Sequence, residues 1–151
     1  MNVDTRMAKL ATALEGVWGI TGDANGEVAY ELQEGGRFLI QHVDLVHGGR
    51  QIRGIELIGR TKGLDGAESE DIHSRFFSFL DGLTLDYIYE LNGRELIIWG
   101  GSKGSPACYR GDLNDDGTVL TGGWQWPGGG YSTITTRFGR TDRPRNRLGQ
   151  K

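Results

Sequence analysis

The sequence has little of what marks secreted or membrane-spanning proteins. It contains one cysteine, Cys108, and three prolines. A lone cysteine forms no internal disulfide, which is usual for a reducing compartment, so the sequence predicts a cytoplasmic protein. No segment approaches the roughly eighteen apolar residues of a membrane span, and no apolar run of signal-peptide length stands at the N-terminus. We therefore expect no membrane association and no secretion.

No charge of one sign dominates the chain. It has 17 basic and 20 acidic residues and a formal net charge of -3. This balance excludes the basic footprint of a nucleic-acid-binding protein. Basic residues gather only near the C-terminus, so we expect a single domain over residues 1–140 and a basic, flexible tail over 141–151.

Glycine, in contrast, is abundant. It accounts for 26 of the 151 residues, more than twice its usual share of about 7%. A glycine inside a helix costs about 1 kcal/mol relative to alanine, so the composition excludes a mostly helical protein. Without a G-X-Y period or many prolines, collagen and proline-rich disorder are excluded too. A β protein with many tight turns remains.

Hydrophobic periodicity predicts one helix followed only by strands. Met7, Leu10 and Leu14 form one apolar stripe over residues 5–14, with Asp4 or Thr5 as the N-cap and Gly16 at the end. The expected strands lie near residues 17–22, 26–33, 36–46, 51–59, 71–80, 84–91, 94–100, 106–113, 118–126 and 131–139. The prediction is an all-β fold, an antiparallel up-and-down β-barrel of about ten strands with a short N-terminal helix.

Hairpin turns set the register and hence the inner face. A two-residue turn at Gly48-Gly49 places Leu45 opposite Ile52 and Gln41 opposite Glu56, and it leaves the opposite charges of Asp44 and Arg53 on the outer face. Both Gln41 and Glu56 are therefore expected to point inward.

Two later hairpins supply aromatic residues to the same face. A turn with Asn92-Gly93 at its centre sets Tyr89 opposite Leu96 and Tyr87 opposite Ile98. A four-residue loop at residues 114–117 sets Tyr109 opposite Gly122 and Ala107 opposite Trp124. The inward glycines Gly54, Gly111 and Gly122 are expected either to bend the barrel or to leave room beside a large neighbour, and leucine in their place is expected to fill the pocket.

Six residues that are expected to point into the barrel are candidates for binding a ligand. Aromatic side chains with polar tips suit a small-molecule pocket, and an inward carboxyl group suits a ligand anchor or an acid–base group. Core packing of the aromatics, or pairing of Glu56 with Arg53 near the rim, is the alternative. The candidates are Gln41, Glu56, Tyr87, Tyr89, Tyr109 and Trp124.

The sequence predicts no metal site, cofactor or catalytic nucleophile. His42, His47 and His73 lack metal-ligand spacing and are expected at the surface. Residues 128–130 lack the Lys-Ser/Thr of a phosphate-binding loop, and no histidine stands near Cys108 in sequence to activate its thiol.

At Gly16-Val17-Trp18, which follows the helix and opens the first strand, the chain resembles the calycin superfamily of lipocalins, fatty-acid-binding proteins and nitrobindins. The segments 36–41, 54–59 and 122–131 resemble a bacterial group of small lipocalin-like proteins of unknown function. The resemblance implies a barrel with an apolar interior, in which Arg137 or Arg140 stacks on Trp18. It supplies no catalytic residue.

Together these observations favour a cytoplasmic, lipocalin-like protein that binds a small apolar or amphipathic molecule inside the barrel. Three alternatives stay open: an isomerase or cyclase that uses Glu56 as acid or base, a haem-binding protein of the nitrobindin type, and a filled barrel that serves as an interaction module. Neither the ligand nor the oligomeric state follows from the sequence.

Overall fold

The protein forms a closed antiparallel β-barrel with one short helix. A computed structural model describes residues 3–138. The expected tail at residues 141–151 lies outside this range. Within it, no helix is both long and apolar enough to span a bilayer.

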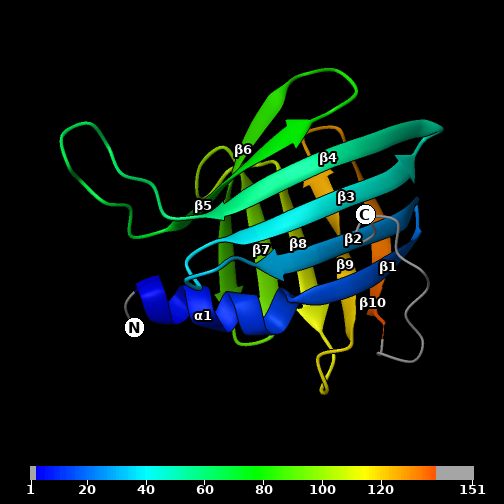
Figure 1. Ribbon diagram of the computed structural model, residues 1–151. Helices are drawn as coiled ribbons and strands as arrows, with labels where there is room; N and C mark the ends of the chain where they lie inside the picture. The colour runs from blue at the N-terminus through cyan, green and yellow to red at the C-terminus, as the bar shows by residue number, and fades with distance from the viewer. Residues whose placement is uncertain (1–2, 139–151) are drawn as a thin grey trace.

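Ten strands follow the helix, and each pairs with its neighbours in the chain (Figure 1). The first strand also pairs with the last, which closes the barrel and leaves no open edge. The elements are α1 (Val3–Leu14), β1 (Gly16–Gly22), β2 (Ala24–Leu32), β3 (Leu39–His47), β4 (Arg50–Gly59), β5 (Ile72–Ser78), β6 (Thr84–Asn92), β7 (Glu95–Gly100), β8 (Cys108–Leu113), β9 (Val119–Trp126) and β10 (Gly129–Arg137). The fold class predicted from the sequence is confirmed.

The β3–β4 hairpin has the predicted register. Leu45 pairs with Ile52, Gln41 with Glu56, and the outer Asp44 with Arg53. Its central glycines have φ values of 59° and 76°. Positive φ at both central residues is what a type I′ turn requires, and glycine adopts it without a steric penalty.

The other two predicted registers are wrong by two residues, although the faces are right. Tyr89 pairs with Ile98 rather than Leu96, and Tyr87 with Gly100. Asn92 belongs to β6, and only Gly93 in this turn has positive φ. The turn is therefore centred one residue later than expected, because a type I′ turn centred on Asn92 and Gly93 needs positive φ at both.

In the β8–β9 hairpin, Tyr109 pairs with Trp124, whereas the sequence predicted Gly122. The side-chain oxygen of Asn114 accepts hydrogen bonds from the backbone N–H groups of Thr118 and Val119, at 2.8 Å and 2.9 Å. Asn114 thus begins the loop instead of lying inside it. A shift of two residues preserves the alternation of side chains, so Tyr109 still points inward.

Two boundaries also differ from expectation. The helix begins at Val3, so Asp4 lies in its first turn rather than at the N-cap. There its carboxylate is 3.3 Å from the Arg37 guanidinium. The third strand begins at Leu39 and not near residue 36, because Gly35 and Gly36 have positive φ and form a turn.

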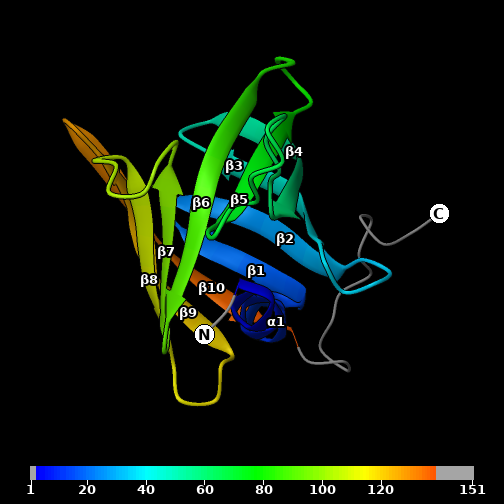
Figure 2. The same ribbon diagram turned by 90° about the vertical axis from the view of Figure 1, so that its left-hand side faces the viewer.

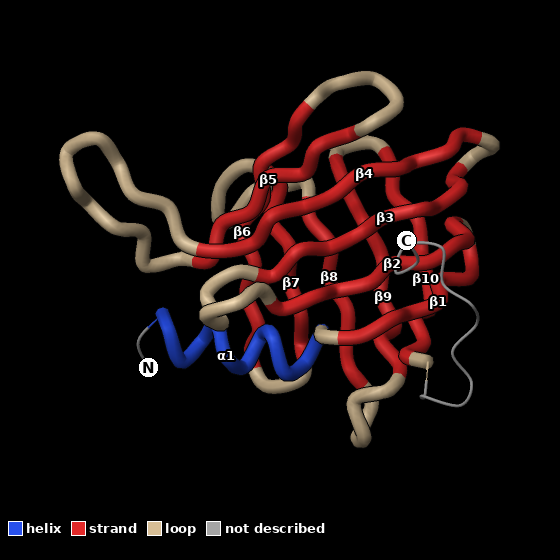
Figure 3. Tube along the Cα trace, viewed as in Figure 1, coloured by secondary structure: helices blue, strands red, loops and turns tan. Residues whose placement is uncertain are grey.

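Alternating connections divide between the two ends of the barrel. The hairpins after β1, β3, β5, β7 and β9 share one end, and the connections after β2, β4, β6 and β8 share the other. The connection at residues 60–71 projects away from the barrel at the second end (Figure 3). Helix α1 lies at this end as well, and Figure 2 looks nearly along its axis.

The helix closes its end of the barrel with its apolar stripe. Met7, Leu10 and Leu14 are buried and belong to the same hydrophobic cluster as the inward residues of the strands. The heptad-like spacing predicted this stripe, and its burial stabilises an otherwise marginal twelve-residue helix.

Arg137 fastens the closed end. Its guanidinium carbon lies 4.4 Å from the ring centroid of Trp18, as the resemblance implied. Its Nη atoms donate to the carbonyl oxygens of Ala13, in the last turn of α1, and of Glu15, just after the helix. Trp18 itself donates from Nε1 to the carbonyl of Leu14 at 2.8 Å. Arg140, the other candidate, lies outside the described residues.

Candidate functional site

The barrel encloses a cavity of about 300 Å³ that is open at one end. Leu14, Trp18 and Leu120 line its closed end. Two lining residues, Leu85 and Trp126, are 53% and 42% exposed and mark the mouth. The volume falls at the lower end of the range for small-molecule sites.

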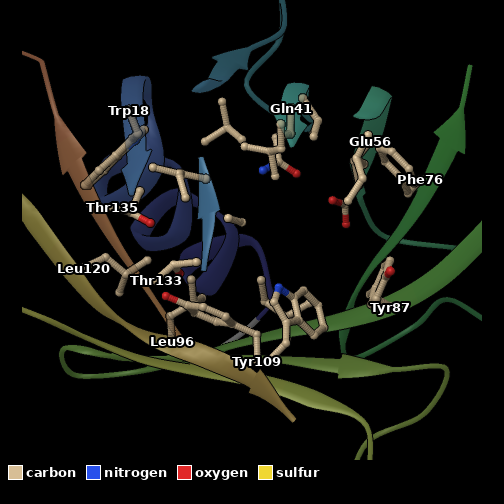
Figure 4. Close-up of a pocket in the computed structure, with 18 of the residues that line it drawn as sticks. Trp18, Gln41, Glu56, Phe76, Tyr87, Leu96, Tyr109, Leu120, Thr133 and Thr135 are labelled. Atoms are coloured by element: carbon tan, nitrogen blue, oxygen red, sulfur yellow. The ribbon is translucent and has the colours of Figure 1, made fainter. Parts of the chain in front are cut away.

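All six candidate ligand-binding residues line this cavity, and Figure 4 labels four of them: Gln41, Glu56, Tyr87 and Tyr109. Glu56 and Gln41 enter from β4 and β3. Tyr87 and Tyr89 enter from β6 next to Glu56, and Tyr109 and Trp124 enter from β8 and β9 farther across the cavity. Strand alternation on the three hairpins therefore brings together residues that stand far apart in the chain.

Glu56 is a buried carboxyl group with two hydrogen-bond donors. Only 5% of the residue is exposed. The hydroxyl groups of Ser74 on β5 and Tyr89 on β6 donate to it. Burial raises the pKa of Glu56 from 4.5 to about 7, and the two hydrogen bonds oppose that rise. The alternative, pairing with Arg53, is not adopted, since Arg53 points outward opposite Asp44.

A chain of hydrogen bonds connects Gln41 to this carboxyl group. Gln41 Nε2 donates to Tyr30 Oη at 3.0 Å, and Tyr30 and Tyr89 are hydrogen-bonded to each other. Each phenol has a single O–H. Tyr89 donates its own to Glu56, so Gln41, Tyr30 and Tyr89 form a continuous chain of hydrogen bonds that ends at the carboxyl group.

Tyr87, Tyr109 and Trp124 form an aromatic cluster on the cavity wall. The ring centroids of Tyr87 and Tyr109 lie 5.6 Å and 5.7 Å from that of Trp124, each at an interplanar angle of 58°. These tilted geometries are favourable for aromatic pairs. Burial raises the pKa values of Tyr87 and Tyr109, so both phenols stay neutral at physiological pH.

Tyr109 Oη is buried with no hydrogen-bond partner among the described residues. The residue is only 5% exposed. A buried hydroxyl without a partner costs about 1–3 kcal/mol. Figure 4 shows this ring on the side of the cavity away from Glu56. A ligand or water with a polar atom there would remove that cost.

Large neighbours lie beside Gly54 and Gly111, as expected, but none of the three inward glycines opens toward the cavity. A Cβ on Gly111 would lie 2.4 Å from Tyr109 Oη. On Gly54 it would lie 2.1 Å from the Phe77 carbonyl oxygen and 2.8 Å from the Phe76 ring, and on Gly122 it would lie 2.1 Å from the Arg110 carbonyl oxygen. Neighbouring rings and backbone already occupy these positions. Leucine there would collide with the wall instead of filling the pocket.

Four polar residues of the interior are not among the candidates predicted from the sequence. Tyr30 and Ser74 belong to the Glu56 cluster, and Thr133 and Thr135 enter from β10 close to Trp18 and Leu120. Alternation along β10 would have found the threonines. Tyr30 and Ser74 could have been placed beside Glu56 only if the pairing of β2 with β3 and of β4 with β5 were known. The sequence has no two-residue turn between either pair of strands that would set this register.

None of the three histidines lines the cavity, and all lie in the described range. His42 lies on the outer face with Nε2 3.4 Å from Glu31, and His73 has outward parity between Ile72 and Ser74. His47 stacks on Tyr131 at the mouth, with centroids 3.9 Å apart. The interior thus offers no histidine to a haem iron. Between residues 3 and 138 no three potential metal ligands of the His/Cys/Asp/Glu types gather.

No protein-family model matches the chain, and no curated protein matches it significantly. The resemblance to the calycin superfamily therefore depends on features of this chain alone, among them the helix, the Gly16-x-Trp18 element and the arginine over the tryptophan.

Proposed function

We propose that this chain is a lipocalin-like member of the calycin superfamily that holds a small apolar or amphipathic molecule in its barrel, in the cytoplasm. The observation that carries the proposal is the 300 Å³ cavity whose wall contains a buried hydroxyl without a partner, Tyr109 Oη. The apolar and aromatic lining supplies affinity for a ligand. Glu56 and Gln41 orient its polar group.

Tryptophan fluorescence tests this proposal, because Trp18, Trp124 and Trp126 line the cavity and Trp99 does not. Titration with fatty acids, flavonoids, polyketides and haem is expected to yield at least one compound that changes the emission and raises the melting temperature. In Trp124→Phe the change in tryptophan emission on adding that compound should be much smaller than in the wild type.

Trp99→Phe is the matched control. Trp99 lies on the outer face, where its Nε1 donates to Glu90 at 2.9 Å and Arg110 covers its ring. Its replacement should leave the ligand-induced change in place. No fluorescence change and no thermal shift with any compound would contradict the proposal.

A second candidate function, proton transfer in the same cavity, is favoured by the Glu56 pKa of about 7. A carboxyl group that titrates near neutral pH serves well as a general base. The test is deuterium exchange at the α-carbons of 4-phenyl-2-butanone in D2O, followed by NMR. Exchange that is catalysed by the wild type and abolished in Glu56→Gln supports it, whereas exchange at the uncatalysed rate contradicts it.

A further inference from the structure

The cavity carries one acidic side chain and no basic one. Of the residues that line it, all of them within the described range, Glu56 is the sole carboxyl group and none is lysine, arginine or histidine. All five tyrosines of the chain line it as well. The side chains that line the cavity therefore carry a formal charge of -1 when Glu56 is ionised and zero when it is protonated.

This charge distribution disfavours an anionic ligand. A carboxylate or phosphate inside the barrel would lie in an apolar space beside Glu56, with no cation to offset its lost hydration. Arg137, which lies at the closed end, directs its guanidinium to Trp18 and to backbone carbonyl groups and is not part of the lining.

The same arrangement suits an ammonium group. Glu56 enters the cavity from β4, Figure 4 shows Tyr87 next to it, and the Tyr87 ring centroid lies 5.6 Å from that of Trp124. The faces of aromatic rings carry partial negative charge and attract cations. A carboxylate with aromatic rings nearby thus offers two kinds of partner to one buried positive charge.

Apart from Thr133 and Thr135, which enter close to Trp18 and Leu120, the two ends of the cavity are mainly apolar. Trp18, Leu96 and Leu120 lie toward the closed end, and Leu45, Ile52 and Leu85 lie toward the mouth. An ammonium at Glu56 therefore needs an attached hydrocarbon or aromatic group to fill the space on either side.

We propose, building on the proposed function, that the cavity selects lipophilic amines: neutral apolar molecules bind more weakly, and anionic ones with the same skeleton bind most weakly. The ammonium forms an ion pair with Glu56 and lies against the Tyr87–Trp124 wall. The single carboxyl group of the lining determines this order of affinities.

Three compounds with one skeleton test the order: 4-phenylbutylamine, 4-phenylbutanol and 4-phenylbutanoate, by calorimetric titration at pH 8. There the amine is protonated and the acid ionised. A hydrogen bond to a charged group corresponds to about tenfold or more in affinity. We expect the amine to bind at least about tenfold more tightly than the alcohol, and the carboxylate to bind more weakly than both.

Glu56→Gln removes the charge and keeps the shape of the side chain. It should abolish the advantage of the amine while the affinity for the alcohol changes by less than about threefold. Glu34→Gln, the same change at an exposed position of the β2–β3 connection, should leave all three affinities unchanged.

Binding of the amine also has a proton signature. Because burial holds the Glu56 pKa near 7, the ammonium should displace a proton at pH 6, measured as a dependence of the binding heat on the buffer. The ionisable groups that face Glu56 are Tyr30, Tyr87 and Tyr89, and burial raises all three pKa values. They stay protonated at pH 6, so Glu56 is the source of the proton.

The outcomes separate this inference from the proposed function. If the alcohol binds and shifts the Trp124 emission but the amine has no advantage, the selectivity for amines is wrong and the ligand-binding function stands. If the advantage persists in Glu56→Gln, the inference is likewise overturned. If none of the three compounds binds, both proposals fail.

Discussion

Glu56 illustrates how burial changes the chemistry of one residue. Its carboxyl group shares the interior with Ser74 and Tyr89, which donate to it, and Gln41 reaches it through Tyr30 and Tyr89. Those donors favour the ionised form, yet desolvation is the larger effect and the pKa rises to about 7. The residue therefore destabilises the fold whenever it is ionised, which is typical of a group retained for binding or catalysis.

This environment predicts how stability depends on pH. The Glu56 pKa is 4.5 in the unfolded chain and about 7 in the folded one, so between these values the folded state holds more protons. The contribution of Glu56 to the free energy of unfolding is therefore fully present below pH 4.5, decreases as the pH rises and is lost above pH 7. From the shift, the loss is roughly 3 kcal/mol.

Urea unfolding of Glu56→Gln measures this contribution. The variant should be more stable than the wild type at pH 8 and should lose the difference at pH 4.5. Glu34→Gln, at an exposed site, should follow the wild-type pH dependence. A Glu56→Gln profile parallel to that of the wild type would show that the carboxyl group is already solvated in the fold.

At the scale of the element, glycines inside strands set how closely β8 and β9 approach. Gly111 pairs with Gly122, and a Cβ on Gly122 would lie 2.5 Å from the Gly111 Cα. The backbones are thus closer here than side chains allow. The Tyr109 ring lies over Gly111 on the inner side. Two glycines therefore allow the close approach of β8 and β9 and leave room for an aromatic residue of the candidate site.

Alanine substitutions separate these two roles. In Gly122→Ala the new Cβ meets the Arg110 carbonyl oxygen at 2.1 Å. Because backbone must move, the free energy of unfolding should fall by about 1–3 kcal/mol. Gly111→Ala meets the Tyr109 side chain, so it should displace that ring and change ligand affinity as well.

Gly63→Ala is the control. It lies in the exposed β4–β5 connection, where the new Cβ meets the side chain of Asp65 first, and its stability should change by less than about 0.5 kcal/mol. Chemical denaturation of the three variants checks the order. Equal stability of Gly122→Ala and Gly63→Ala would contradict the close approach of β8 and β9.

At the scale of the whole molecule, the two ends of the barrel differ. One end is closed by α1 and by Arg137, which joins the last strand to the final turn of the helix and to Glu15 just after it. The other end is the mouth, with Leu85 and Trp126 exposed. The closed end gives the cavity a floor, and the open end gives a ligand its route.

Arg137→Lys tests the closure. Lysine lacks the planar fork that reaches two carbonyl groups and lies over an indole at the same time. We expect the free energy of unfolding to fall by about 1–3 kcal/mol. Arg110→Lys is the matched control, since Arg110 also lies over a tryptophan, Trp99, at 5.1 Å, but on the outer face.

Urea unfolding of the two variants gives the comparison. The loss for Arg110→Lys should stay below about 1 kcal/mol, as for an exposed cation–π contact. Losses of equal size would mean that the hydrogen bonds of Arg137 to the helix terminus contribute nothing to the closure.

The sequence by itself determined the barrel and its approximate number of strands. It also determined which face of the β3–β4, β6–β7 and β8–β9 hairpins points inward. Period-two alternation and turn glycines are local features, and an error of two residues in the Asn92 and Asn114 turns left the faces unchanged. For the same reason all six candidate residues could be placed in one interior before the fold was known.

Only the tertiary structure decided what that interior is. Whether Glu56 meets Arg53 or Ser74 depends on strands that come from different hairpins. The partners of Gly54 and Gly111, the volume of the cavity and the unpartnered Tyr109 Oη depend on how closely neighbouring strands pack. Burial and distance between remote segments are properties of the closed barrel, and these set the pKa and the charge that a ligand meets.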